Sequence, residues 1–425
     1  MSAAGDKIQK LREKAVGERL EKLYGAEQLP CQRERYAGLI RRHEELFGGS
    51  GRLFLISAPG RTEIGGNHTD HNNGRVLAAA VNLDALCAVT PREDLRVRFH
   101  SEGYKPIEMS LEELAPLENE KGTTRGLIRG VAAGMKQAGY AIGGFDAAVT
   151  STVAGGSGLS SSAALEVMLT GVFDALFNRF DMPYVLRAQI SQRAENDYFG
   201  KPSGLLDQMA SAAGGLVTVD FRDNAHPEVR RLAYDFAAKG YTLVVTATGG
   251  SHAGLTHHYA AIPREMKLVA KYFGQETLRG IAAERIRAEA GSLRRICGDR
   301  AVMRAMHFVR EDARVPEEVA ALEGNDLKRF LELIIESGRS SFMYLQNVYV
   351  DNQDQSLSLA LCLAEDLLSG RGAWRIHGGG FAGTTLNFVP TEQAEAFVKM
   401  MEGAFGAGCC HALNIRPEGA AFLTL

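Results

Sequence analysis

The order of apolar and polar positions along the chain predicts helices and strands in separate blocks. Residues 6–24 and 30–46 carry apolar side chains at helical spacing and predict two amphipathic helices. Residues 52–59 (RLFLISAP) form an apolar run that ends at a Pro-Gly pair, which is typical of a strand before a turn. The same criteria predict strands at 76–90, 94–100, 145–153, 216–221, 242–248, 373–377, 384–390 and the final FLTL, and helices at 123–140, 182–200, 391–404 and over most of 255–368.

This arrangement indicates the fold class and a division of the chain. Helices and strands do not alternate regularly, which favours an α+β fold. No period of 20–50 residues repeats, and no low-complexity linker is present. A chain of 425 residues has the length of two or three domains. We place a boundary near 214–240 and expect an N-terminal domain of residues 1–214 and a C-terminal domain of residues 215–425.

Composition narrows the class of protein. Hydrophobic residues make up 45% and charged residues 23% of the chain, which is ordinary for a globular protein. The net charge of −3 argues against nucleic acid or an anionic membrane as a partner. We expect no membrane span and no secretory signal, because no apolar run of about 18 residues exists and the N-terminus lacks an apolar core. The six cysteines show no CxxC spacing, which favours a reducing, cytoplasmic location.

A small-residue segment, AGGSGLSSSAAL at 154–165, carries the strongest chemical signal. It lies between a predicted strand and an apolar helix, where free N–H groups and the helix dipole attract anions. Small residues also let the backbone approach a ligand closely, which favours a phosphate-binding loop. The segment is not a Walker A loop, because it lacks GK[ST]. The alternative is a serine N-cap on a tightly packed helix. The residues expected to face the phosphates are Gly155, Gly156, Ser157, Gly158, Leu159, Ser160, Ser161 and Ser162.

A second glycine cluster, GGGFAG at 378–383, formally matches GxGxxG. A dinucleotide-binding loop opens a helix, whereas residues 384–390 predict a strand. The cluster is therefore either a hairpin or bulge, or a second loop that faces a ligand.

Two carboxylates follow the phosphate loop. Glu195 lies near the end of one predicted helix, and Asp207 opens the next. An aspartate at a helix start is more often a cap than a catalyst. Their nearness to a phosphate loop favours chemical roles, in which one carboxylate holds Mg²⁺ and the other orients or deprotonates a hydroxyl.

The segment GRTEIGGNHTDHN at 60–72 concentrates polar groups after a predicted strand. As a transition-metal site it is weak, because the spacing of His68, Asp70 and His71 does not match HExxH-type motifs and no flanking residue supplies the further ligand that those motifs have. As a plain turn it holds more polar residues than a turn needs. A carboxylate accepts hydrogen bonds from two hydroxyls, and histidine, asparagine and Arg61 add further contacts and a fixed positive charge. The segment therefore favours a polyol-binding loop.

Three of these motifs stand in an order that resembles a known family. Residues 58–81 resemble the galactokinase signature, residues 153–167 the phosphate loop of the GHMP kinases, and residues 375–390 their C-terminal glycine motif. The resemblance extends over about residues 40–390. It implies a two-domain GHMP kinase fold with the active site in the interdomain cleft, and an N-terminal domain that carries the sugar loop and the phosphate loop.

The resemblance also implies an activity: an ATP-dependent sugar 1-kinase that converts galactose to galactose 1-phosphate and ADP. Asp207 matches the carboxylate beside the C1 hydroxyl, and Arg61 matches its partner near the transferred phosphoryl group. Ser162 and Glu195 match Mg²⁺ ligands, and the loop at 155–162 would hold the ATP phosphates. The positions that match sugar contacts are Asn67, His68, Asp70, Gly204 and Tyr259. The expected partners are the sugar and ATP alone, and the expected state is a monomer or weak homo-oligomer.

Three positions depart from the family pattern, which usually reads GEHTDY. Asn67 and His71 replace the glutamate and the tyrosine, and Glu63 stands where asparagine is usual. An amide at position 67 would tolerate an acidic substituent that a glutamate repels. We therefore hypothesise, as an alternative, a substrate that is modified at C6, such as galacturonate.

Two further alternatives remain. One is a catalytically silent galactokinase-like sensor, which known examples reached by losing residues after the serine run. Ser162 and Ala163 are intact here, as are Arg61, Glu195 and Asp207, which favours an enzyme. The other is a homoserine or mevalonate kinase, whose branches lack the HTDHN loop.

Overall fold

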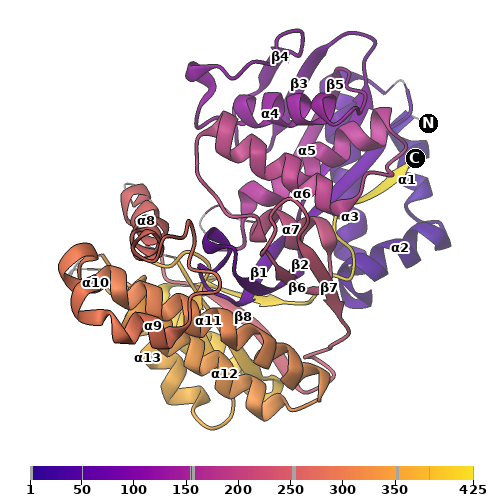
Figure 1. Ribbon diagram of the computed structural model, residues 1–425. Coiled ribbons are helices and arrows are strands. Elements are labelled where there is room, and N and C mark those ends of the chain that lie inside the picture. The colour runs from indigo at the N-terminus through magenta and orange to yellow at the C-terminus, as the bar shows by residue number, and fades with distance from the viewer. Residues whose placement is uncertain are drawn as a thin grey trace.

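Two β-sheets and the helices that cover them make up the chain (Figure 1). The computed structural model describes residues 3–49, 51–153, 155, 158–250, 255–350, 354–381 and 383–424. The strands of the larger sheet are β1 (Phe54–Gly65), β2 (Arg75–Pro91), β3 (Arg96–Ser101), β4 (Ile107–Ser110), β5 (Phe145–Ser151), β6 (Leu216–Asp220), β7 (Glu228–Leu232) and β12 (Ala421–Thr424). Those of the smaller sheet are β8 (Tyr241–Ala247), β9 (Ala373–His377), β10 (Thr384–Pro390) and β11 (Cys410–Leu413).

The larger sheet has the order β12-β1-β2-β5-β3-β4, and β6 pairs with β2 and with β7. All its pairs are antiparallel except β3 with β5. The smaller sheet is antiparallel and has the order β11-β8-β10-β9.

Fourteen α-helices lie in the described ranges. They are α1 (Ala3–Lys10), α2 (Lys14–Tyr24), α3 (Leu29–Phe47), α4 (Thr124–Gln137), α5 (Ser161–Phe177), α6 (Tyr184–Arg193), α7 (Leu206–Ala213), α8 (Thr256–Tyr272), α9 (Ala283–Ala288), α10 (Ala290–Cys297), α11 (Asp299–Glu323), α12 (Leu327–Ser340), α13 (Ser356–Leu368) and α14 (Ala394–Phe405). None of them is long and apolar enough to cross a membrane.

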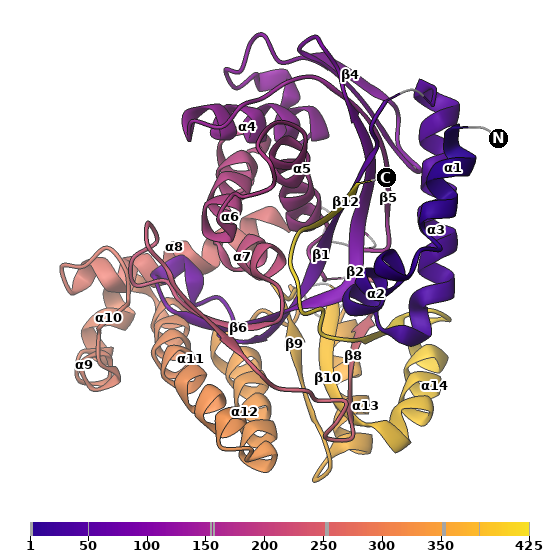
Figure 2. The same cartoon turned by 90° about the vertical axis from the view of Figure 1, so that its right-hand side faces the viewer.

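Helices cover both faces of the larger sheet (Figure 2). Side chains alternate between the two faces along a strand. In β1, Ile56 packs in the apolar cluster shared with α4–α7, and Leu55 packs in the cluster shared with α1–α3. Because both faces are covered, β1 is buried along its whole length, and its apolar residues form the continuous run seen in the sequence.

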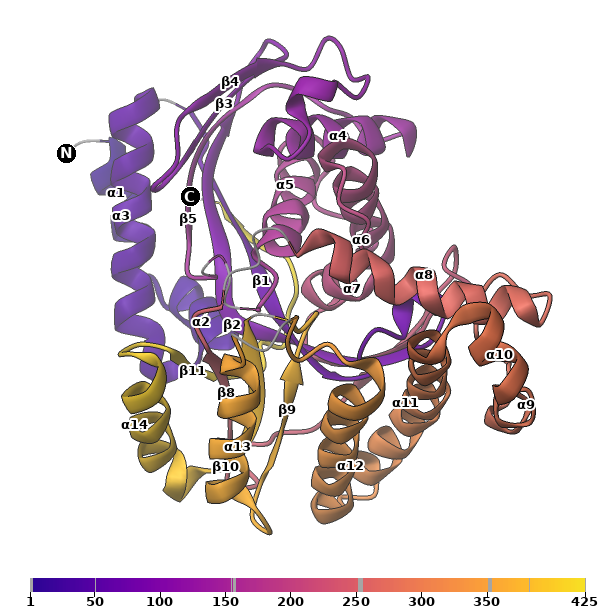
Figure 3. The same cartoon turned by 90° about the vertical axis from the view of Figure 1, so that its left-hand side faces the viewer.

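The smaller sheet and the helices from α8 onwards form the other half of the molecule (Figure 3). Helices α13 and α14 pack on this sheet around Phe397 and Trp374. Helices α8–α11 share a separate apolar cluster that includes Met266 and Phe308.

Asp84 on β2 connects distant parts of the chain. Its carboxylate accepts hydrogen bonds from Arg35 of α3 at 2.6 Å, from Tyr24 of α2 at 2.5 Å and from Arg416 near the C-terminus at 3.3 Å. Burial alone would raise the pKa of Asp84, but the two arginines and the hydrogen bonds from Ser57 and Tyr24 hold it below its usual value. The N-terminal helices and the C-terminal segment are thereby joined to the larger sheet.

The α+β class and most predicted elements are confirmed, with three differences. The helix predicted over 6–24 is two helices, because a turn over 11–13 separates them. The helix predicted over 182–200 ends at Arg193 and continues as the π-helical turn η4 (Ala194–Phe199). The short strands β4, β7 and β11 were not predicted, since they are brief and, as in β7 (EVRRL), polar.

The sheets do not follow a single division of the chain at residue 214. Strands β6 and β7 follow this residue but belong to the larger sheet. The chain then enters the smaller sheet at β8, and β12 returns to pair with β1, with Phe54 opposite Thr424. The boundary at residue 214 therefore stays a prediction.

Candidate active site

A cavity of about 440 Å³ lies where the two halves of the molecule meet, and its volume is typical of small-molecule sites. It is lined by the end of β1, the loop at 68–71, the start of α5, the first turn of α7 and the segment before it, one side of α8 and the turn between β9 and β10. These segments bring together Arg61, Asp70, Ser160, Asp207 and Tyr259, which the sequence predicts as site residues.

Arg61 and Asp207 form a planar, two-bond ion pair on the cavity wall. Arg61 Nε donates to Asp207 Oδ1 at 2.7 Å, and Nη2 donates to Oδ2 at 2.8 Å. Ser160 Oγ donates to the same Oδ2 at 2.7 Å, and Arg61 Nη1 donates to the carbonyl of Gly158 at 2.5 Å. The Asp207 side chain keeps 30% of its surface exposed, and it lines the cavity.

The surroundings of Asp207 keep it ionised. Burial alone would raise its pKa, but the charge of Arg61 and the hydrogen bonds from Arg61 and Ser160 outweigh that effect. The pKa therefore lies below the usual value. Asp207 stands in the first turn of α7, as predicted, and its carboxylate is bound by Arg61 and Ser160.

The start of α5 has the geometry expected of a phosphate loop. Ser160 precedes the first turn in the left-handed conformation (φ 58°), and its hydroxyl makes no cap bond to the helix. The hydroxyl is instead directed at Asp207, so the simple N-cap alternative does not describe Ser160. Gly158, Ser160, Ser161 and Ser162 line the cavity, where free N–H groups of the helix start would meet an anion.

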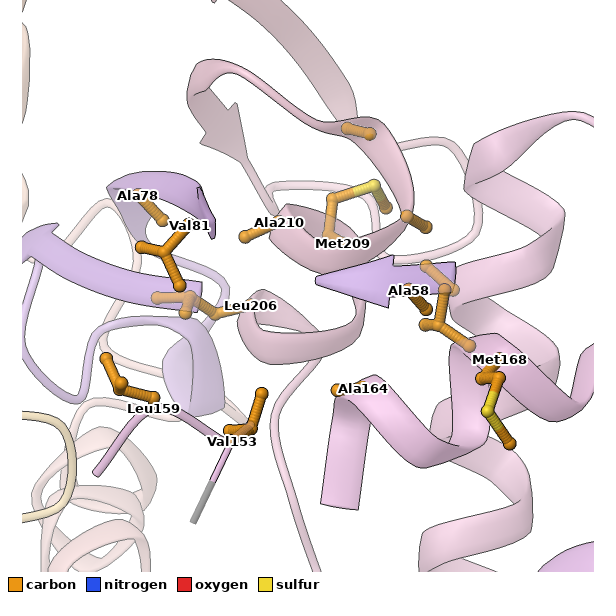
Figure 4. Packing of buried hydrophobic residues seen from close by; sticks show 14 of the residues in the cluster. Ala58, Ala78, Val81, Val153, Leu159, Ala164, Met168, Leu206, Met209 and Ala210 are labelled. Carbon is orange, nitrogen blue, oxygen red and sulfur yellow. The ribbon is translucent and has the colours of Figure 1, made fainter. Parts of the chain in front are cut away.

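Leu159 has a structural role in this loop. Its side chain is fully buried among Val153, Ala164 and Leu206 (Figure 4). Its carbonyl accepts a hydrogen bond from the Arg61 backbone N–H at 3.0 Å, which attaches the loop to β1. The Leu159 side chain is therefore structural, and a phosphate contact through its backbone N–H stays a prediction. Gly155 is not among the cavity-lining residues, and Gly156 and Ser157 lie outside the described residues.

The second glycine cluster is both a turn and part of the cavity wall. It connects the antiparallel strands β9 and β10, and residues 378–380 line the cavity. A Cβ on Gly379 would lie 2.7 Å from Tyr259 Cε1, so this position has no room for a side chain. The Tyr259 hydroxyl donates to the Gly380 carbonyl at 2.8 Å. Burial raises the pKa of Tyr259 to about 12, so this hydroxyl keeps its proton.

The sugar loop predicted at residues 60–72 forms the opposite wall. His68 has a left-handed backbone (φ 58°), and its Nε2 donates to the Gly379 carbonyl at 3.0 Å. Burial lowers the pKa of His68 to about 3, so the ring is neutral. A Cβ on Gly204 would lie 1.7 Å from Asp70 Oδ2. The Asp70 carboxylate therefore packs directly on the Gly204 backbone, which explains why a glycine stands there.

Asn67, in contrast, does not line the cavity. Its side chain is fully buried, and the N–H and C=O groups of its amide form all their hydrogen bonds with protein groups. Its Nδ2 donates to Glu63 Oε1 and to the Gly378 carbonyl, both at 2.8 Å, and its Oδ1 accepts from Ser341 and Asn347, both at 3.0 Å. The predicted sugar contact is therefore not available to this side chain. The reasoning that led from Asn67 to a C6-modified sugar loses its structural basis.

The cavity lining includes Glu63 and His377, for which the sequence predicts no role. Glu63 is one of the positions that depart from the family pattern. His377, at the end of β9, accepts a hydrogen bond from the Glu63 backbone N–H at 3.2 Å and pairs with Thr384 Oγ1 at 3.1 Å. Burial lowers the pKa of His377 well below its usual value, so the ring is neutral. Glu63 could have been found from its spacing, because alternate residues of a strand share a face and Arg61 is two positions before it.

Glu195 lies in a buried group of carboxylates and amides beside α5. Its Oε1 accepts from Lys201 at 2.8 Å, and its Oε2 accepts from Gln208 at 2.9 Å. Gln208 also donates to Glu166 at 2.9 Å, and Glu166 lies one helical turn after Ser162. Within the part of the chain that the structure describes, no group of three or more His, Cys, Asp or Glu side chains could hold a metal ion. Magnesium ligation by Ser162 and Glu195 stays a prediction.

Comparison with known proteins identifies the family. Residues 41–91 match the galactokinase galactose-binding signature, and residues 126–215 match the N-terminal domain of GHMP kinases. A galactokinase of Streptomyces coelicolor is 33% identical over 381 residues, which cover 88% of this chain and 94% of that protein. The chain belongs to the galactokinase family. Galactokinases of Streptomyces lividans and Glaesserella parasuis are 33% and 31% identical, over 82% and 84% of this chain and 85% and 90% of theirs.

Solved structures agree with the family and with the expected GHMP kinase fold. The crystal structure of Lactococcus lactis galactokinase complexed with galactose has a TM-score of 0.81 and 25% identity, and covers 91% of this chain and 99% of that one. A mevalonate kinase has a TM-score of 0.58 at 14% identity, over 87% and 98%. The higher score of the galactokinase places the chain in that branch, and as a galactokinase-family member it is a kinase.

Proposed function

We propose that the protein is an ATP-dependent galactose kinase that transfers the terminal phosphoryl group of ATP to the anomeric hydroxyl, giving galactose 1-phosphate and ADP. The Arg61–Asp207 pair carries this proposal. It lines the same cavity as the serines at the start of α5 and the His68–Asp70 loop, so one cavity would join a phosphate site to a polyol site. The sugar is inferred from the relatives, which are galactokinases, and from the Lactococcus lactis galactokinase, whose crystal structure is a complex with galactose.

The residues of the cavity match the demands of phosphoryl transfer, which depends on alignment and charge neutralisation more than on covalent chemistry. The N–H groups at the start of the 17-residue helix α5 would bind the ATP phosphates together with Ser161 and Ser162. The Arg61 guanidinium is fixed by bonds to Asp207 and the Gly158 carbonyl, so it needs little reorganisation to stabilise the developing charge.

Asp207 acts on the sugar hydroxyl as an orienting acceptor. Its lowered pKa makes it a weak base. An ionised carboxylate beside the cavity can still accept a hydrogen bond from the C1 hydroxyl and hold the attacking oxygen in line with the phosphate. The sugar ring would be bound by His68, Asp70 and Tyr259.

The chain offers oxygen ligands suited to Mg²⁺. The Ser162 hydroxyl and the Glu195 carboxylate are hard donors of the kind that this ion prefers, with phosphate and water as further ligands. Buried oxygens of Glu166 and Gln208 beside Glu195 have no hydrogen-bond partner among the described residues, which fits a site that accommodates a cation. Lys201 contacts one Glu195 oxygen and would move aside. Bound Mg²⁺ would neutralise the phosphate oxygens.

The location and state of assembly follow as parts of the same proposal. All six cysteines are free thiols, which fits a reducing, cytoplasmic compartment. The site is built from a single chain, so a monomer or weak homo-oligomer can be active.

The decisive experiment measures ADP release with ATP and Mg²⁺ over a panel of hexoses, and locates the new phosphate by ³¹P NMR. We expect galactose to give the highest kcat/KM and the product to carry phosphate on C1. Binding of galactose and ATP without ADP release would identify a silent sensor instead. A phosphate on another carbon would contradict the assignment of Asp207.

A further inference from the structure

Glu63 is a charged residue of the cavity that has no role in the proposed phosphoryl transfer. It follows Arg61 by two residues on β1, and the ladder to β2 is regular between them, with Arg61 opposite Ala80 and Glu63 opposite Ala78. Alternate side chains of a strand share a face, and both residues line the cavity. Their Cα atoms are separated by roughly 6.6 Å along the strand, at about 3.3 Å per residue.

This separation would place Glu63 at the far end of a sugar whose C1 hydroxyl lies at Asp207. Arg61 and Asp207 mark the end of the cavity where the C1 hydroxyl reacts. A displacement of two strand residues is comparable to the length of a hexose ring. A hexose with its C1 hydroxyl against Asp207 would therefore present the half of its ring that carries C4 and C6 to Glu63.

The Glu63 carboxylate is held with one oxygen bound and the other directed to the cavity. Its Oε1 accepts from Asn67 Nδ2 and from Arg375 Nη2, both at 2.8 Å. Arg375 is fully buried and also donates to the Ile64 carbonyl, so this side of the carboxylate is fixed. Its Oε2 has no hydrogen-bond partner within the described ranges. One carboxylate oxygen is thus available to a ligand without any rearrangement.

We propose that Glu63 is a specificity-determining residue, which accepts a hydrogen bond from a neutral hydroxyl on the C4–C6 half of the sugar and rejects a sugar acid there. The inference rests on the proposed function, since the orientation of the sugar follows from C1 transfer. Two carboxylates in a water-poor cavity repel each other, whereas a hydroxyl donates to the free oxygen. The asparagine and glutamate usual at positions 63 and 67 are exchanged in this chain, so the loop retains its carboxylate. We therefore expect the protein to bind galactose more tightly than galacturonate, which is the opposite of the hypothesis based on Asn67.

Equilibrium binding tests this role without requiring turnover. Calorimetry at pH 8, above the pKa of about 7 that burial gives Glu63, would measure Kd for galactose and galacturonate. We expect the Glu63→Gln variant to shift the ratio of the two Kd values toward galacturonate by ~10-fold or more, equivalent to about 1.4 kcal/mol. A ratio within threefold of the unchanged protein would overturn the proposal.

Glu318→Gln is the matched control. Glu318 on α11 is a buried glutamate that packs against the same end of β1, since a Cβ on Gly65 would lie 1.8 Å from its Oε2. It does not line the cavity. This variant should leave the ratio of Kd values unchanged. Melting temperatures of both variants would show that the fold is retained.

A ligand-side comparison needs no variant at all. Galacturonamide has nearly the shape of galacturonate but no charge, so the unchanged protein should bind it at least ~10-fold more tightly. Equal affinities would overturn the proposal even if Glu63→Gln does not fold. Absence of ADP release with every sugar would overturn the proposed function instead, and the binding ratios would remain a separate result.

Discussion

Replacing Asp207 by asparagine removes one negative charge from the cavity and preserves the shape of the side chain. In the unchanged protein, both carboxylate oxygens accept from Arg61, and Oδ2 also accepts from Ser160. Asparagine has one acceptor oxygen and one amide group that can only donate. The amide would therefore face a donor of Arg61 or of Ser160, and it could not accept from the C1 hydroxyl on that side.

The magnitude follows from the bonds that are lost. A hydrogen bond to a charged group contributes about 1.5–3 kcal/mol. If the variant loses one such bond and weakens a second, the transition state loses about 3–4 kcal/mol of stabilisation, which corresponds to a fall in kcat/KM of roughly 10²–10³. If Asp207 also removes the proton, general-base catalysis adds a further factor of about 10²–10⁴. The size of the loss therefore separates an orienting role from a base.

The assay is coupled ADP release with galactose and ATP, accompanied by circular dichroism and thermal melting of the variant. Asp299→Asn is a suitable control, since Asp299 also stands in the first turn of a helix and pairs with an arginine, at 3.0 Å, but lies outside the cavity lining. The control should retain full activity. A folded Asp207→Asn enzyme that loses less than about tenfold in kcat/KM would refute the reasoning, because that is below the contribution of one charged hydrogen bond.

Three further predictions concern other contacts. Arg61→Lys should lower kcat/KM by ~10² or more, because a point charge cannot reproduce the planar two-bond pair; near-normal kinetics would argue against this. Gly204→Ala should raise KM for galactose more than KM for ATP, because the new Cβ displaces the Asp70 carboxylate, and steady-state kinetics with each substrate varied would show it. Asp84→Ala should lower the free energy of unfolding in urea by about 3–5 kcal/mol, because the buried Arg416 and the partly buried Arg35 lose their counter-charge. The folded-state pKa of Asp84 lies below its usual value, so in the unchanged protein its contribution to the free energy of unfolding should be complete above about pH 4. This contribution should disappear as pH falls through the lower, folded-state pKa, and urea unfolding measured over a range of acid pH would detect the loss.

The contrast between Leu159 and Ser160 shows how far motif reasoning reaches. Both belong to a small-residue loop whose position between a strand and a helix is readable from the sequence, and in the structure the helix begins at Ser161. The sequence does not show which of the two side chains faces the ligand. In the structure Leu159 enters the core, and Ser160 turns to Asp207 through its left-handed backbone.

Asn67 and Glu63 show the same limit within one strand and its following loop. The family pattern directs attention to position 67, but the second half of the molecule supplies Ser341 and Asn347, which saturate the Asn67 amide. With Asn67 buried beneath the cavity, Glu63 lines it instead. Neither outcome is visible from residues 60–72 alone, because Ser341 and Asn347 lie more than 270 positions from Asn67.

The sequence by itself determined the family, the α+β class, the order of most elements and the chemical types at the site. Each of these depends on neighbours along the chain, such as apolar spacing within an element or glycines and serines at a helix start. Only the tertiary structure decided the two-bond geometry of the Arg61–Asp207 pair, the pairing of β12 with β1 in the larger sheet, and the presence of His377 and Glu63 in the cavity lining. The physical reason is that periodicity specifies which residues share a face, whereas the packing of one buried face against another specifies what that face contacts.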